Sequence, residues 1–178
     1  LHELAHGFAA ISQGDDTPKR AGHITLNPVV HMGVESLIFL CIAGISWGQM
    51  PVNPYKFRNG RISDIWVSAA GPLSNLALAL LSILLLLIFY DSGLLSRDFI
   101  YLAARVNLTL FLFNMLPIPP LDGFSIFSNI FPELKQLQGS PIGTFGLMII
   151  FLIPGFGGGL IKIADSLILT CIRFKFGF

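Results

Sequence analysis

The first seven residues carry the clearest chemical pattern in the chain. They read LHELAHG, which places His2 and His6 four positions apart with Glu3 between them. On a helix, side chains four positions apart share a face, so two imidazoles can hold one metal ion. A carboxylate beside such a pair is suited to take a proton from water. The pattern predicts metal-assisted hydrolysis, against the alternative of an amphipathic helix with two surface histidines.

A zinc ion at this pair would need a third protein ligand. Asp122 is the favoured candidate, because a carboxylate at the end of an apolar span is costly unless it has a partner. Its alternative role is that of a turn aspartate capping the next segment. The other candidates lie in the most polar stretch of the chain, where histidines are more often solvated than ligating: His23, His31 and Glu35.

Two asparagines lie in apolar stretches and are further candidates. The amides of Asn75 and Asn114 could donate to a developing oxyanion or hold an extended peptide backbone. The alternative is hydrogen bonding between helices, which is common in membranes.

Composition indicates an integral membrane protein of one domain, residues 1–178. Hydrophobic residues make up 53% of the chain and charged residues 12%, about half the charged share of soluble domains. The mean hydropathy is +0.74. A net charge of +1 indicates no nucleic-acid partner. Cys41 and Cys171 fall in apolar stretches and predict neither a disulfide framework nor a zinc knuckle.

Hydrophobic runs predict the elements that position these residues. We expect a helix over residues 1–12 and membrane-crossing helices over residues 64–90 and 99–116. Small and polar residues recur at helical spacing in the first of these spans, so one stripe should face protein or water: Ser68, Gly71, Asn75 and Ser82.

The apolar segment 36–50 is too short to cross. Its fifteen residues span about 22 Å as a helix, against a hydrocarbon core of about 30 Å. We therefore expect it to enter the membrane and return. Within it, Gly44 and Gly48 are spaced as in a close helix contact.

Other segments are predicted to be irregular. Alternation at Ile24 and Leu26 indicates a short extended stretch, and the prolines of residues 117–123 also force extended geometry. Residues 124–141 are predicted to be a mixed loop. Residues 142–172 form a last apolar element, for which a single kinked span and a hairpin both remain open.

Basic residues set the expected orientation. If segment 36–50 returns, five basic residues lie on one side, which the positive-inside rule makes cytoplasmic: Lys19, Arg20, Lys56, Arg58 and Arg61. Asp122 and the histidines then meet in the cytoplasmic half. Because the metal motif stands at residue 2, we expect an upstream transmembrane part to be missing. The predicted fold is an all-α polytopic transmembrane helical bundle, N-terminally truncated, with a short re-entrant or extended segment.

Three stretches together resemble a known family. They are His2-Glu3-x-x-His6, the sequence GPLSN at residues 71–75, and NMLPIPPLDG at residues 114–123. In this order they resemble the signatures of the site-2 protease family, intramembrane zinc metalloproteases. LNP at residues 26–28 with His31, and PVNP at residues 51–54, are similar to the compact bacterial branch without a PDZ domain. His23 and Met50 depart from that branch's usual residues.

The resemblance implies a function and a set of roles. One Zn²⁺ per chain would be bound by His2, His6 and Asp122, with Glu3 as the catalytic base. Asn75 and Asn114 would assist substrate binding or the oxyanion. The substrate would be a peptide bond in or near a transmembrane segment of another membrane protein. The location would be the lipid bilayer of the bacterial inner (cell) membrane, with the active site in its cytoplasmic half.

Two other functions compete with this reading. A catalytically inactive relative that binds membrane proteins is disfavoured because Glu3 and both motif histidines are intact. A metal carrier is disfavoured because the chain has one such motif and no further intramembrane His or Asp along a path.

Overall fold

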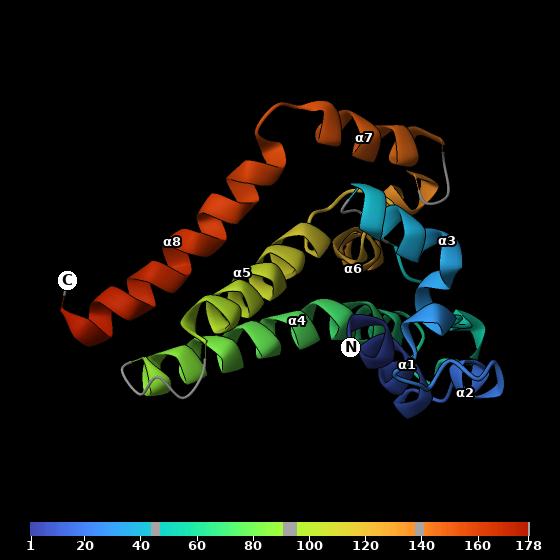
Figure 1. Ribbon diagram of the computed structural model, residues 1–178. Coiled ribbons are helices and arrows are strands. Elements are labelled where there is room, and N and C mark those ends of the chain that lie inside the picture. Colours follow the sequence, from blue (N-terminus) through green and yellow to red (C-terminus); the bar gives the residue numbers. More distant parts are fainter. Residues whose placement is uncertain (44–46, 91–95, 138–140, 178) are drawn as a thin grey trace. The chain divides into compact units, whose positions relative to one another are not determined.

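The computed structural model describes residues 1–43, 47–90, 96–137 and 141–177, and all regular elements within these ranges are helical (Figure 1). This confirms the predicted all-α class. The chain divides into two compact units, residues 1–71 and 72–178. Each unit is described by itself.

The first unit is built from short helices and the start of one long helix. Its elements are α1 (His2–Ser12), α2 (Thr17–Arg20), α3 (Pro28–Ala43), the 3₁₀ turn η1 (Pro54–Lys56) and the first turns of α4 (Arg61–Phe89). The predicted helix over residues 1–12 is confirmed. No strand forms around Ile24 and Leu26, whose surroundings are bends and turns.

The end of α1 is fastened to the start of α4. Gln13 accepts two hydrogen bonds, from the Arg58 N–H to its carbonyl (2.9 Å) and from the Ser63 hydroxyl to its Oε1 (2.7 Å). One turn earlier on α1, Ala10 is buried in a small core with Phe57 and Val67. The two helices therefore run antiparallel, and residues nearer the start of α1 lie beside later residues of α4.

Helix α3 leads into a segment that returns to it. The helix is kinked at Gly33, whose φ of 72° lies in the left-handed region that glycine adopts without strain. The Ser36 hydroxyl donates to the Trp47 carbonyl (2.7 Å) and accepts from the Trp47 N–H (2.9 Å). A third bond joins the Gln49 N–H to the His31 carbonyl (2.9 Å).

These bonds place the two ends of the apolar segment side by side, as the predicted entry and return require. Residues 44–46 lie outside the described residues, so Gly44 cannot be compared with its prediction. The predicted helix contact at Gly48 is wrong, because Gly48 lies beyond α3 in a stretch without regular secondary structure. Helix α3 also begins at Pro28, eight residues before the predicted segment.

Asp15 connects two loops of the first unit. Its side chain is fully buried and accepts hydrogen bonds from the Thr17 N–H (3.0 Å) and the Asn53 N–H (2.6 Å). The ammonium of Lys56 lies 3.9 Å away. Burial raises the pKa of Asp15, but the hydrogen bonds from Thr17 and Asn53 and the charge of Lys56 outweigh it and hold the pKa below its usual value.

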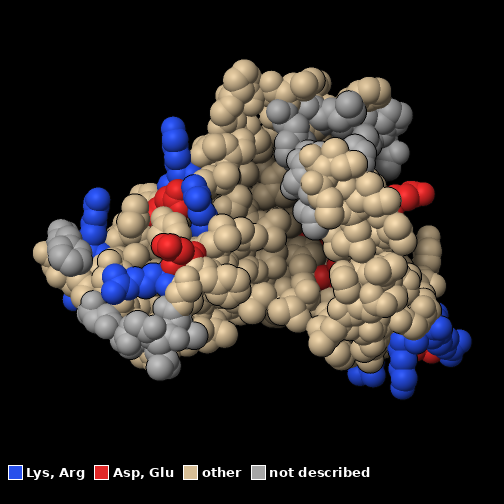
Figure 2. All heavy atoms as spheres, in the orientation of Figure 1, with Lys and Arg blue, Asp and Glu red and all other residues tan. Residues whose placement is uncertain are grey.

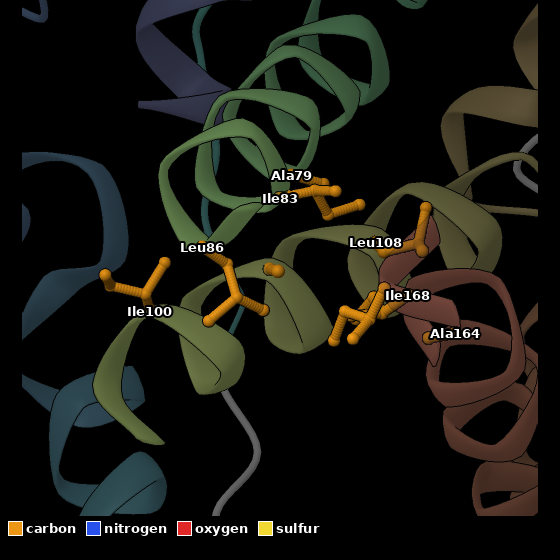
Figure 3. Close-up of a cluster of buried hydrophobic side chains, with 9 residues drawn as sticks. Ala79, Ile83, Leu86, Ile100, Leu108, Ala164 and Ile168 are labelled. Atoms are coloured by element: carbon orange, nitrogen blue, oxygen red, sulfur yellow. The ribbon is translucent and has the colours of Figure 1, made fainter. Parts of the chain in front are cut away.

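The second unit is a packed set of helices. It contains the rest of α4, α5 (Arg97–Asn114), α6 (Asp122–Ile130), the 3₁₀ turn η2 (Pro132–Leu137), α7 (Pro141–Leu152) and α8 (Phe156–Phe176). Helices α4, α5 and α8 share an apolar core (Figure 3). Fully buried alanines from all three helices allow their backbones to approach closely: Ala79, Ala104 and Ala164.

A charged group also joins α5 to α8. Asp165 pairs with Arg105 (Nη2 to Oδ2, 3.0 Å) and accepts a hydrogen bond from the Tyr101 hydroxyl (2.8 Å). Charged side chains in apolar helices are costly unless they have partners, so this cluster favours one pairing of the two helices.

Among the described residues, α4 is the one helix long and apolar enough to cross a membrane. Its 29 residues extend about 43 Å, and only 28% of its most apolar 18-residue segment is buried. The exposed residues of its outer face are mainly aliphatic: Leu73, Leu80, Leu81, Leu84 and Ile88. On the face drawn in Figure 2, wide areas carry no charged side chain. The predicted helix over residues 64–90 therefore forms, and it has the length and composition of a membrane span.

Three predicted segments that follow α4 can also be compared with the structure. Residues 99–116 do form a helix, α5, but its three charged residues (Arg97, Asp98 and Arg105) leave it short of a clear membrane span. The loop predicted over residues 124–141 is wrong for the described residues, because α6 covers residues 122–130 and η2 covers residues 132–137; residues 138–140 of that prediction lie outside the described residues. In the last apolar element, α7 and α8 are separate helices that meet at Gly155, where φ is 84°.

The buried carboxylate of Asp15 generates a stability prediction. In Asp15→Asn, the amide NH₂ must face one of two N–H donors, which leaves that donor unsatisfied at a cost of about 1–3 kcal/mol. The thermal midpoint of the purified protein at pH 7 should therefore fall. Asp16→Asn is the matched control, because Asp16 makes a solvent-exposed ion pair with Lys56, a type that contributes little.

The sign of the pH dependence follows from the lowered pKa. The stabilisation by Asp15 is complete above the unfolded-state pKa of about 3.9 and is lost as pH falls through the lower folded-state pKa. The difference between wild type and Asp15→Asn should therefore shrink in strong acid. Equal midpoints at pH 7 would contradict the role given to Asp15.

Candidate metal centre

His2 and His6 lie together on α1. Their Nε2 atoms are 3.0 Å apart, and their rings meet edge to face with centroids 4.7 Å apart. Two nitrogens bound to one tetrahedral zinc at about 2.0–2.1 Å would be about 3.3 Å from each other. The pair is therefore spaced for a single ion with little adjustment.

The protonation state of His6 is set by a backbone contact. Its Nδ1 lies 2.7 Å from the Val67 carbonyl oxygen, and the residue is buried. A carbonyl oxygen only accepts hydrogen bonds, so Nδ1 must carry the proton. The Nε2 lone pair of His6 is then available for a metal, which is the arrangement usual in metal-ligating histidines.

Gly71 of α4 allows both imidazoles to approach this helix closely. A Cβ placed on residue 71 would lie 2.2 Å from the His6 Nε2 and 2.6 Å from the His2 Nε2. Both distances are far shorter than van der Waals contact, so the two Nε2 atoms can lie where they do only because residue 71 has no side chain. The close approach keeps the two nitrogens at the spacing that fits one zinc ion.

Glu3 follows His2 on the same helix and is partly exposed. Its side chain lies against Gly48, in the irregular stretch that follows α3. A Cβ on residue 48 would come within 2.6 Å of the Glu3 Oε1. Glu3 is thus held beside the ligand pair by its place on α1 and contacts a backbone segment.

The alternative third ligands of the first unit lie elsewhere. The His31 Nε2 donates to the Thr25 carbonyl (2.7 Å), and its ring meets that of His23 at a centroid distance of 6.0 Å. Within the described part of this unit, neither these histidines nor Glu35 forms a three-ligand group with His2 and His6.

Asp122 and Asn114 belong to the second unit, on either side of a tight turn. Asp122 is the first residue of α6, where the helix dipole favours negative charge. A Cβ on Gly123 would lie 2.5 Å from the Met115 carbonyl group, so the start of α6 folds closely onto the end of α5. The Asn114 amide donates to the Leu110 carbonyl of its own helix (3.0 Å).

Asn75 lies on α4, one turn after Gly71, and is only 3% exposed. Ser68 and Gly71 are buried as well, so the predicted polar stripe does face protein at these positions. The roles of Asn75 and Asn114 in catalysis stay predictions.

Some contacts at the centre were not foreseen from the sequence. Gly71 was recognised as part of a motif and of the polar stripe, without a role at the histidine pair, and the Val67 carbonyl has no signal in the sequence. A signal for Gly71 did exist, because glycine inside a helix costs about 1 kcal/mol relative to alanine and usually marks a close approach. Pro72 directly after it adds a second unfavourable residue within α4.

The geometry predicts that Gly71→Ala abolishes metal binding without removing a ligand. The new methyl group would occupy the space beside both Nε2 atoms, and His6 cannot rotate away without losing its bond to the Val67 carbonyl. Zinc content per chain, measured by atomic emission on purified protein, should fall from about one to near zero. Gly157→Ala is the control, because nothing lies within 4 Å of its added Cβ. Full zinc content in Gly71→Ala would refute the assigned metal position.

Comparison with known proteins identifies the family. Residues 91–154 match the family model described as Peptidase family M50. Over 166 residues the chain is 37% identical to a Bacillus subtilis protein named "Putative zinc metalloprotease YwhC", with 86% of this chain and 76% of that protein covered. No solved protein structure gave a significant match.

Two further relatives bear the same designation. MJ0611 of Methanocaldococcus jannaschii is 39% identical over 161 residues, covering 85% of this chain and 75% of its own. Rip2 of Mycobacterium tuberculosis is 30% identical over 170 residues, covering 89% of this chain and 64% of its own. Identity at this level over this share of YwhC and MJ0611 confirms the resemblance that the three motifs indicated. The chain therefore belongs to peptidase family M50, the site-2 protease family of zinc metalloproteases.

Proposed function

We propose that this chain is a zinc metalloendopeptidase that hydrolyses peptide bonds within or near transmembrane segments of other membrane proteins. The observation that carries the proposal is the pair of Nε2 atoms that lie 3.0 Å apart against Gly71, with the proton of His6 fixed on Nδ1. Membership of a peptidase family supports the reaction class. The apolar, largely exposed α4 supports a site at the membrane.

In this proposal His2, His6 and Asp122 hold one zinc ion. Asp122 is supported by its place in the third family motif, at the start of a helix that follows an irregular proline-rich turn. It is also supported by elimination, because the described candidates of the first unit do not join the histidine pair. Zinc bound there would supply Lewis acidity, which polarises the scissile carbonyl and makes a water molecule more acidic.

Glu3 moves the proton during hydrolysis. Its carboxylate takes a proton from the attacking water as the water oxygen bonds to the carbonyl carbon. It then passes that proton to the amine nitrogen as the carbon–nitrogen bond breaks. The products are a new carboxylate and a new amine. A position next to the ligands on the same helix suits Glu3 to both transfers.

Asn75 and Asn114 have supporting roles in the proposal. Each carries an amide that can donate to the developing oxyanion or to the substrate backbone. The Asn114 amide must first leave its bond to the Leu110 carbonyl, so its contribution would begin when substrate binds.

The surrounding fold is proposed to be a polytopic bundle in the lipid bilayer of the bacterial inner (cell) membrane. Helix α4 crosses, and α5 and α8 pack with it through their shared core. A substrate helix hides its amide groups in internal hydrogen bonds and must unwind before it can be cut. The return of the segment after α3 leaves the basic residues around Lys19 and Arg58 on one side, which we take as cytoplasmic.

The function is tested by separating the base from the ligands. Glu3→Gln keeps the shape of the side chain but cannot accept the proton, so it should retain about one zinc per chain and lose cleavage. His2→Ala should lose both. The measurements are zinc content and cleavage of a panel of tagged single-span membrane proteins by full-length enzyme in vesicles. Cleavage by Glu3→Gln at the wild-type rate would refute the mechanism.

The third ligand is tested by metal retention alone. Asp122→Ala should weaken zinc binding by more than the roughly 10- to 100-fold that loss of an outer partner costs. His31→Ala is the matched control and should bind zinc as the wild type does, because His31 bonds to the Thr25 carbonyl instead. Competition with a zinc chelator gives the dissociation constants. The reverse order of the two variants would move the third ligand to α3.

A further inference from the structure

Gly48 contacts the Glu3 side chain along its length. A Cβ on residue 48 would lie 2.6 Å from the Glu3 Oε1, 2.9 Å from Cγ and 3.0 Å from Cδ. Real Cβ atoms essentially never make contacts this short. The hydrogen that glycine carries in place of a side chain therefore leaves the room that the Glu3 carboxylate occupies.

Backbone conformation does not explain the glycine. Gly48 is absent from the described glycines with positive φ, such as Gly33 and Gly60, so alanine could adopt its backbone angles without strain. Glycine is needed there because any side chain at residue 48 would occupy the space that Glu3 fills.

The stretch that contains Gly48 is fastened on both sides. Trp47 exchanges two hydrogen bonds with the Ser36 hydroxyl, and the Gln49 N–H donates to the His31 carbonyl. Further along, the Asn53 N–H is held by the buried carboxylate of Asp15. A methyl group on residue 48 could displace this stretch only by breaking such bonds.

The backbone of Glu3 is also fixed, because His2 and His6 flank it on α1 and His6 is bonded to the Val67 carbonyl. The side chain of Glu3 can rotate about its own bonds, and the short contacts fall on its Cγ, Cδ and Oε1 atoms. An added methyl group would therefore be relieved by rotation of the Glu3 carboxylate, at small cost to the fold.

We propose that Gly48 is a positioning residue for Glu3: its backbone forms the wall against which the carboxylate is placed for proton transfer. The proposal rests on the function given above for Glu3 and adds the element that fixes its geometry. Two different parts of the first unit then position the groups of the metal centre. The contact of α1 with α4 sets the metal ligands, and the stretch after α3 sets the base.

The test is Gly48→Ala in the full-length enzyme, assayed with whichever tagged single-span protein the wild type cuts fastest. A carboxylate displaced by about 1 Å should lower kcat about 100-fold. Zinc content should stay at about one per chain and the thermal midpoint should stay at the wild-type value. A lower midpoint or loss of zinc would overturn the proposal, because the methyl group would then displace the scaffold instead of Glu3.

A double-mutant cycle makes the test specific to the contact. Glu3→Asp is shorter by one methylene and withdraws Oε1, the atom that makes the shortest of the three contacts, so Gly48→Ala should cost less in that background. Additive losses would overturn the proposal. Gly7→Ala is the matched control, since its Cβ meets only the flexible ends of Ile24 and Met50, and it should keep the wild-type rate.

The Glu3→Gln variant separates this proposal from the function on which it rests. Activity in Glu3→Gln would refute the role of Glu3 itself. Inactive Glu3→Gln together with fully active Gly48→Ala would leave that role intact and refute only the positioning by Gly48.

Discussion

The hydrogen bond from the His6 Nδ1 to the Val67 carbonyl is the contact on which the metal centre depends. It assigns the proton of His6, orients the ring and joins α1 to α4 in one interaction. It can form only where the helices approach closely, which the missing side chain of Gly71 allows. The anchoring of Gln13 by Ser63 and Arg58 then sets how far α1 can slide along α4. A change in that register would move both Nε2 atoms away from the space beside Gly71.

The sequence predicted best where one periodic signal was strong. The spacing of His2 and His6 placed both on one face of α1, and the long apolar run of residues 64–90 identified α4. It predicted worst where short elements depend on packing. The prolines before Asp122 and the polar residues after it indicated a loop, yet α6 forms there and buries Phe124 together with Ser128 and Asn129. Packing in the folded unit outweighed the helix-breaking residues nearby, and a single sequence does not show that packing.

The candidate site shows the same limit. Residue types and spacing were enough to name the candidate ligand pair and the candidate base beside it, because these share one turn of helix. The partners of that turn come from residues sixty or more positions away, as with His6 and Val67, or from a backbone stretch such as that around Gly48. A carbonyl oxygen has no residue type, and a glycine has no side chain to suggest chemistry. Only the folded arrangement of the first unit reveals what they do.

Gly71 and Gly48 both act by lacking a side chain, but the atoms that lie close to them belong to different groups. At Gly71 the nearby atoms belong to rings, of which His6 is anchored by a backbone bond, so intrusion there would act on the metal. At Gly48 the nearby atoms belong to the flexible side chain of Glu3, so intrusion would act on the proposed proton acceptor. Proton transfer is sensitive to displacements of about 1 Å, whereas a flexible side chain relieves such a contact at little cost to stability. In the proposed mechanism the stretch around Gly48 therefore acts on the position of the base and not on the metal ligands.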